Sequence, residues 1–176
     1  KDDGYEFDEE AVTVFFKNDY KEIALGKKDL VTVLEEQLPK WNLIMSVDEL
    51  LEYWFSYENN IDVRITDLSD DLREKGYKCF VASDHSKWRG DNVMNEVGLK
   101  EHFDGMFLSA DLGALKHDIA YFEKVVEQLG LDKSEVLFVD DEEENVEAAS
   151  GFVLQAHHYT DYDLFIKELR WLDVEV

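Results

Sequence analysis

Residues 135–141, Glu-Val-Leu-Phe-Val-Asp-Asp, decide the fold of this chain. The apolar run 136–139 ends in two acidic residues, Asp140 and Asp141. A short continuous apolar run of this kind is typical of a strand buried on both faces of a parallel sheet. Helical sequence follows at once in residues 142–151, EEENVEAASG. The stretch therefore predicts a strand-to-helix unit with two carboxylates at the carboxyl end of the strand.

Three more apolar runs, each beside a helical segment, extend this pattern along the chain. The runs are 77–83 (YKCFVAS), 105–111 (GMFLSAD) and 152–159 (FVLQAHHY), and the helical segments are 86–98, 117–130 and 161–172. Strands that alternate with amphipathic helices indicate a parallel sheet covered on both faces. The predicted fold class is α/β, a Rossmann-like parallel sheet with helices on both faces and a small helical cap.

The cap is predicted from the N-terminal sequence, which has a different texture. Residues 8–72 contain no convincing strand. Asp8 is placed to cap a first helix, although the Val and Thr content of residues 11–20 leaves a strand as the rival interpretation. Ser46 and Glu49 have the spacing of a capping box. We expect residues 20–65 to form the helical cap, and residues 1–19 and 66–176 to form the α/β core.

Composition excludes several classes of protein. The 176 residues include 18 Lys and Arg against 42 Asp and Glu, a formal net charge of -24. This balance excludes a binder of nucleic-acid backbones and argues against adsorption to anionic membranes. A hydrophobic fraction of 45% excludes a disordered chain, and one cysteine excludes a disulfide framework. The acidic N-terminal sequence KDDGYEFDEE is the opposite of a signal peptide, so we expect a cytoplasmic protein.

Chemically useful side chains follow the predicted strands. In open parallel sheets, ligands bind beyond the carboxyl ends of the strands. Ser83 and Asp84 follow the first apolar run, Lys116 lies at a helix start after the second, and Asp140 and Asp141 end the third. Paired carboxylates suit Mg²⁺, a serine at such a turn suits a phosphate, and a lysine neutralises phosphoryl charge. Together these groups form the electrostatic part of a phosphoryl-transfer site.

Other candidate residues are weighed against plainer roles. His85 lies in the site loop, where it acts on a leaving group or is an ordinary loop histidine. His157 and His158 are adjacent on a strand and point to opposite faces, which disfavours a shared metal ion. Cys79 lies inside an apolar run and is interpreted as a core residue. Lys116 is expected at the exposed edge of the sheet.

The order of the motifs resembles the haloacid dehalogenase (HAD) superfamily. VASDHS (81–86), GALKHD (113–118) and FVDDEEENVEAA (138–149) are similar to its second, third and fourth motifs. The resemblance covers roughly residues 10–170. It is to the phosphatase-like branch with a small helical cap.

The resemblance implies a role for each matched residue. Ser83, with Asp84 beside it, would bind the phosphoryl group, and Lys116 would hold the nucleophile and the phosphate charge together. Asp141 would coordinate Mg²⁺ directly or through water, with Asp140 beside it and Asn145 in support. The implied activity is a Mg²⁺-dependent phosphatase that acts on a small phosphorylated metabolite through an aspartyl-phosphate intermediate. His117 replaces a proline of the family pattern, and Asp84 replaces a common asparagine.

The family's first motif, a central strand ending in the nucleophilic aspartate, has no counterpart in these residues. Too few residues precede Asp8 for a buried strand, so we expect the nucleophile strand upstream of Lys1 and no nucleophile among residues 1–176. One alternative is a catalytically inactive HAD-like binding or structural protein. Another is a dehalogenase, which needs no Mg²⁺ and so leaves the acidic pair without a role. The sequence indicates neither the particular phosphate ester nor the oligomeric state.

Overall fold

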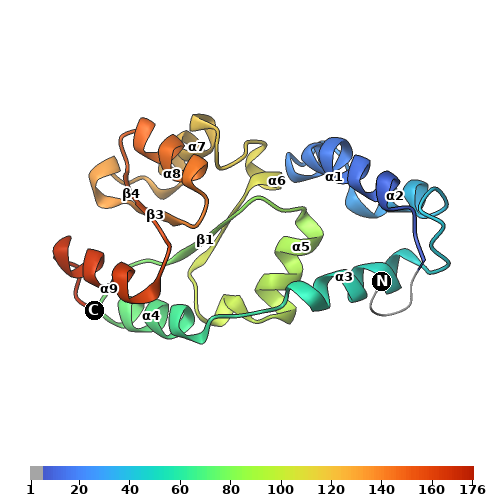
Figure 1. Cartoon of the computed structure of the whole chain (residues 1–176). Helices are drawn as coiled ribbons and strands as arrows, with labels where there is room; N and C mark the ends of the chain where they lie inside the picture. Colours follow the sequence, from blue (N-terminus) through green and yellow to red (C-terminus); the bar gives the residue numbers. More distant parts are fainter. Residues whose placement is uncertain (1–5) are drawn as a thin grey trace.

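The computed structural model describes residues 6–176 and shows an α/β protein rich in helices (Figure 1). Helices α1 (Glu9–Ala24), α2 (Leu30–Gln37) and α3 (Val47–Glu58) form a helical group at one end, and α4 (Val63–Glu74) leads from it to the strands. The strands are β1 (Phe80–Ser83), β2 (Gly105–Leu108), β3 (Leu137–Asp140) and β4 (Gln155–His158). The remaining α-helices are α5 (Lys87–Asp91), α6 (Ser109–Leu112), α7 (Ile119–Leu129), α8 (Glu143–Gly151) and α9 (Tyr162–Trp171).

The four strands form two parallel pairs. β1 pairs with β2, so that Ser83 lies opposite Leu108, and β3 pairs with β4, so that Asp140 lies opposite His158. All four predicted strands are present, which confirms the α/β class. Within residues 6–176, however, β1 is bonded only to β2 and β3 only to β4, so the sheet is divided between β1 and β3.

A groove with a volume of about 910 Å³ has both β1 and β3 in its walls. We call it the interstrand groove. Helices α4 and α9 contribute apolar side chains to it, and the candidate site residues Lys116, Asp140 and Asp141 line it as well. Its lining includes Leu68, Phe80, Ala82, Lys116, Leu137, Val139, Asp140, Asp141, Phe165 and Leu169.

Helices cover β3 from both sides because its side chains alternate. Phe138 packs with Tyr121 and Phe122 of α7 in one buried cluster. Leu137 and Val139 pack against a second cluster, which α4 and α9 build from Leu68, Phe165 and Leu169. The prediction of helices on both faces is therefore confirmed at this strand.

The helical group has an apolar core of its own. Phe15 of α1 is 1% exposed and packs with side chains of α2 and α3, including Leu34 and Phe55. Asp8 caps α1 by accepting a hydrogen bond from the Ala11 N–H at 3.0 Å, so the rival strand interpretation of residues 11–20 is wrong. Ser46 forms the predicted capping box at the start of α3.

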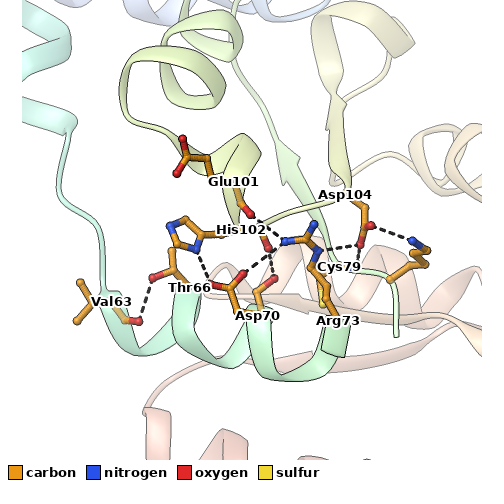
Figure 2. A network of polar contacts seen from close by, with 10 residues as sticks. Val63, Thr66, Asp70, Arg73, Cys79, Glu101, His102 and Asp104 are labelled. Atoms are coloured by element: carbon orange, nitrogen blue, oxygen red, sulfur yellow. Dashed lines mark hydrogen bonds and ion pairs between the residues drawn. The ribbon is translucent and has the colours of Figure 1, made fainter. Parts of the chain in front are cut away.

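A polar network fixes α4 to the amino ends of β1 and β2, at the opposite end of these strands from the candidate site residues (Figure 2). The Asp104 carboxylate accepts a hydrogen bond from the Cys79 N–H at 2.9 Å and also contacts Arg73 of α4. Asp70 of α4 contacts His102 Nδ1 at 2.7 Å, just before β2. The network is structural, because it holds the edge of the sheet opposite to the candidate site.

The helical group meets the α/β part where α1 ends. Ser109 Oγ of α6 donates a hydrogen bond to the Ala24 carbonyl at 2.7 Å. Gly26 has φ +68°, and a Cβ there would collide with the Ala110 carbonyl. Trp88 Nε1 of α5 donates to Asp29 at 3.0 Å. A glycine is therefore required where α1 approaches α6.

None of the helices within residues 6–176 combines the length and apolar character needed to cross a lipid bilayer. Residues 1–5 of the predicted core lie outside the described residues.

Candidate active site

The side chains of Lys116 and Asp140 form an ion pair at the carboxyl end of β3. Lys116 Nζ donates to Asp140 Oδ2 at 2.7 Å, and the two side chains are 14% and 4% exposed. The Lys116 side chain is thus far more enclosed than the exposed position at the sheet edge that we expected from the sequence. Removing one partner of such a pair leaves a buried charge without compensation, so each residue needs the other.

The second oxygen of Asp140 organises the loop that leads into α8. Asp140 Oδ1 accepts hydrogen bonds from the Glu142 N–H and from Asn145 Nδ2, both at 3.0 Å. Asn145 is buried. Asp140 is therefore fixed on both oxygens, and its orientation is set before any ligand arrives.

Asp84 links the end of β1 to the residue that supplies the ammonium group. Both of its carboxylate oxygens lie 3.1 Å from the Lys116 backbone nitrogen, which donates to them. Burial raises the pKa of Asp84, although the nearby Lys116 and its N–H oppose this shift. Ser83, the last residue of β1, directly precedes Asp84. The structure thus brings Ser83, Asp84, Lys116 and Asp140 to neighbouring strand ends.

Asp141 differs from Asp140 in being exposed, and it lines the interstrand groove. Its backbone carbonyl lies 2.9 Å from His158 Nε2, which fixes the backbone at this position. His157 instead stacks on Phe165, with ring centroids 5.3 Å apart. The two adjacent histidines therefore have separate partners on β4.

The oxygen donors of this site fit Mg²⁺ in part. Mg²⁺ is usually held by one or two carboxylates, with water and phosphate oxygens completing its shell, and Asp140 and Asp141 supply such a pair. Among residues 6–176, no three or more His, Cys, Asp or Glu side chains gather closely enough to hold a metal ion by themselves. The described residues would thus share a bound Mg²⁺ with other ligands.

Two residues that sequence reasoning did not pair meet beside the site. Tyr20 Oη of α1 lies 3.0 Å from His85 Nδ1, in the loop after β1. Burial raises the pKa of Tyr20 to about 12, and burial lowers the pKa of His85. Both side chains are therefore neutral near pH 7. No local spacing announces the pair, because 65 positions separate its members.

Arg89 was also missed, and it joins α5 to the end of α3. Its side chain is buried, donates to Asn59 and Asn92 at 2.7 Å, and lies 5.1 Å from the ring centroid of Phe55. Its Nε is 3.4 Å from a carboxylate oxygen of Glu58. Through these contacts the buried arginine positions the helical group beside the loop after β1, although its Nε has no hydrogen-bond partner among the described residues.

This geometry is that of an α/β protein with a charged site at the strand ends. The family model described as haloacid dehalogenase-like hydrolase matches residues 7–155. The chain belongs to that family.

Two curated relatives are similar to parts of the chain. A sesquiterpene phosphatase, astK, of Aspergillus oryzae is 33% identical over 116 residues, which are 63% of this chain and 57% of the relative. An (S)-2-haloacid dehalogenase of a Pseudomonas species is 31% identical over 75 residues, 43% of this chain and 32% of the relative. The chain thus spans 57% and 32% of the lengths of these proteins.

Solved structures share the fold at low sequence identity. A predicted HAD-like hydrolase of Porphyromonas gingivalis has a TM-score of 0.74 at 19% identity, covering 97% of this chain and 93% of that one. A HAD family enzyme of Bacteroides thetaiotaomicron, an Asp-to-Ala mutant in complex with magnesium and inorganic phosphate, has a TM-score of 0.71 at 20% identity, covering 90% and 91%. These likenesses confirm the HAD-like fold.

Proposed function

We propose that this HAD-like hydrolase is a Mg²⁺-dependent phosphatase of a small phosphorylated metabolite. The observation that carries the proposal is the enclosed Lys116–Asp140 pair, with the exposed Asp141 beside it at the strand end. A fixed ammonium group next to carboxylates that suit Mg²⁺ is an arrangement for transferring a phosphoryl group. The similarity to a protein named as a sesquiterpene phosphatase supports this choice within the family.

Each residue has a defined task in this proposal. The hydroxyl and the backbone N–H groups after β1 at Ser83 bind phosphoryl oxygens, and Asp84 holds the Lys116 backbone in place. Lys116 Nζ neutralises charge that builds up on the phosphoryl group, while Asp140 keeps the ammonium aimed. Asp141 and Asp140 hold Mg²⁺, which when bound supplies positive charge to the phosphoryl oxygens.

The nucleophile in this proposal comes from a further strand that occupies the interstrand groove. β1 and β3 both border the groove, its walls are largely apolar, and Lys116 and Asp140 lie in its lining. An aspartate at the carboxyl end of such a strand attacks phosphorus and forms an Oδ–P bond as the P–O ester bond breaks, and the departing oxygen takes a proton from solvent and leaves as the alcohol. Water then attacks phosphorus and releases phosphate and the free aspartate.

The organisation around this site remains as proposed from the sequence. In this proposal residues 20–65 act as the cap that selects the substrate, and residues 1–19 and 66–176 act as the core, with α1, which crosses the boundary, packed against α2 and α3. The protein works in the cytoplasm on a small-molecule phosphate ester, without nucleic acid or membrane partners.

Replacing Asp141 with asparagine tests the metal assignment. We measure hydrolysis of p-nitrophenyl phosphate by the full-length natural protein, with and without Mg²⁺. Asp141→Asn is expected to lower Mg²⁺-dependent turnover by about 100-fold or more, because it removes a charged ligand. Glu143→Gln, a change of the same charge on an exposed residue of α8, is the control and retains turnover. Unchanged turnover of Asp141→Asn contradicts the assignment.

Dehalogenation is the second candidate, supported by the similarity to an (S)-2-haloacid dehalogenase. Chloride release from 2-chloropropionate without Mg²⁺, together with no phosphatase activity, would select it. Absence of both activities in the natural protein would select the third possibility, an inactive HAD-like binding or structural protein.

A further inference from the structure

A second cavity, with a volume of about 280 Å³, lies within the helical group. We call it the aromatic pocket. Phe16 of α1 and Leu50, Trp54 and Tyr57 of α3 line it, together with Trp41. Among the described residues in its lining, Glu58 alone carries a charge. The volume is near the lower end of the range for small-molecule sites, and the walls suit a hydrocarbon.

The charge of Glu58 is already compensated by protein groups. Trp54 Nε1 donates to Glu58 Oε1 at 2.7 Å, and Arg89 Nε lies 3.4 Å from Glu58 Oε2. Because both carboxylate oxygens face donors from the chain, the pocket offers little to a cationic or strongly polar ligand. Its binding energy must come from burying apolar surface.

Tyr20 lies between the aromatic pocket and the candidate active site. The ring centroid of Tyr20 lies 5.5 Å from that of Phe16 and 5.8 Å from that of Trp54, two of the rings that line the pocket. On its other side, the Tyr20 hydroxyl lies 3.0 Å from His85 Nδ1. His85 is two positions after Ser83, in the loop where the phosphoryl group binds. The pocket and the phosphate site are thus separated by one tyrosine and one histidine.

We propose that the aromatic pocket binds the hydrocarbon part of the substrate, and that the substrate is a phosphate ester of an apolar alcohol. This inference rests on the proposed phosphatase function, and it assigns the substrate class. Tyr20 and His85 form the surface between the two ends of the ester. Because both side chains are neutral near pH 7, neither repels the hydrocarbon of the substrate. The Phe16 and Trp54 rings contact the hydrocarbon.

A series of alkyl phosphates of increasing chain length, from butyl to dodecyl, tests the inference on the natural protein, with glycerol phosphate as the polar comparison. We expect kcat/KM to rise about fourfold for each methylene that enters the pocket and then to level off. Hydrolysis of all members at equal kcat/KM would overturn the inference while leaving the phosphatase function intact.

Two exposed positions of α1 provide a matched pair of variants. Phe16 lines the aromatic pocket and is 45% exposed, whereas Val14 is 49% exposed and does not line it. Phe16→Ser is expected to flatten the dependence of kcat/KM on chain length. Val14→Ser is expected to retain the dependence. Equal behaviour of the two variants contradicts the assignment of the pocket.

Two further experiments test the aromatic pocket: a variant that fills part of it, and a measurement of binding without turnover. Leu50→Phe reduces the pocket volume and should move the plateau to shorter chains, a result that partial unfolding does not produce. Titration of decyl phosphate, followed by tryptophan fluorescence, reports binding without turnover. If no ester is hydrolysed, the proposed function fails, and saturable binding that Phe16→Ser abolishes still supports the pocket. No binding and no dependence on chain length overturn it.

Discussion

Under the proposed function, Lys116 ties catalysis to stability because one side chain serves both. Its ammonium group lies 2.7 Å from Asp140, and its backbone N–H donates to Asp84. Asp140 is 4% exposed and bonded to the start of α8, so the ion pair also holds the loop between β3 and α8. For any substitution of Lys116, the free energy of unfolding must therefore be measured as well as the turnover.

Lys116→Met is expected to lower the free energy of unfolding by about 3 kcal/mol, because it leaves the buried Asp140 carboxylate without its cation. Urea denaturation at pH 7 measures this difference. Lys87→Met is the control, since its pair with Asp111 is exposed on both sides and should cost less than about 1 kcal/mol. Adding Asp140→Asn to Lys116→Met should recover part of the loss. Equal losses for Lys116→Met and Lys87→Met would contradict this role.

The sequence was sufficient to find the residues that follow the strands. Ser83, Asp84, Lys116, Asp140 and Asp141 could be predicted because each lies at the end of an apolar run or just before a helix, and parallel strands bring such positions to one edge. No comparable rule identifies contacts between distant segments. The pairing of Tyr20 with His85 depends on how α1 docks beside the loop after β1. That docking is a tertiary property, which local patterns do not encode.

At the scale of elements, Asp104 controls how α4 and β1 are held together. The Cys79 N–H and, to a smaller extent, the Lys78 ammonium hold the pKa of Asp104 below its ordinary value. The folded state therefore favours the ionised carboxylate. Stability from this group is present above the unfolded pKa of about 4 and is lost as the pH falls through the lower, folded pKa.

Asp104→Asn is accordingly expected to lower the melting temperature by a few degrees at pH 7, with the difference shrinking as the pH falls below about 4. Thermal melts of the variant and the natural protein between pH 7 and pH 3 measure it. Asp71→Asn, on the exposed side of α4, serves as the control and should show no such trend. A loss that stays constant across this pH range would refute the electrostatic explanation.

Element types were predictable, but their pairing was not. The period of the apolar residues identifies β1 to β4 and α7 to α9, since burial on a strand or helix repeats along the chain. The predicted helix 86–98 is instead α5 followed by a π-helical turn, Asn92–Glu96, and it ends before Gly98, whose φ is +91°. Whether two parallel strands are direct neighbours depends on backbone hydrogen bonds between remote segments, which periodicity does not reveal.

At the scale of the whole molecule, Gly26 sets how closely the helical group approaches the α/β part. Its φ of +68° and its contact with the Ala110 carbonyl leave no room for a Cβ atom. The hydrogen bond from Ser109 Oγ to Ala24 depends on this close approach. The position of the aromatic pocket relative to the strand ends is fixed at this joint.

Gly26→Ala is therefore expected to lower the free energy of unfolding by about 3 kcal/mol, as the sum of a left-handed backbone and a backbone collision. Gly130→Ala is the matched control. Its φ is +65°, but an added Cβ meets nothing within 4 Å, so only the backbone cost of about 1–2 kcal/mol remains. Urea denaturation measures the free energy of unfolding of both variants. Equal losses for Gly26→Ala and Gly130→Ala would show that Gly26 does not lie as close to the Ala110 carbonyl as described.

The division of the strands into two pairs also bears on cooperativity. Within residues 6–176, strand-to-strand hydrogen bonds do not cross the interstrand groove, so the β1–β2 and β3–β4 halves are joined by side-chain clusters around α7 and between α4 and α9. A strand bound in the groove would hydrogen-bond to both halves at once. Binding of the strand that carries the nucleophile would then join the halves into a single folding unit, and the catalytically complete state would be the one that unfolds all at once.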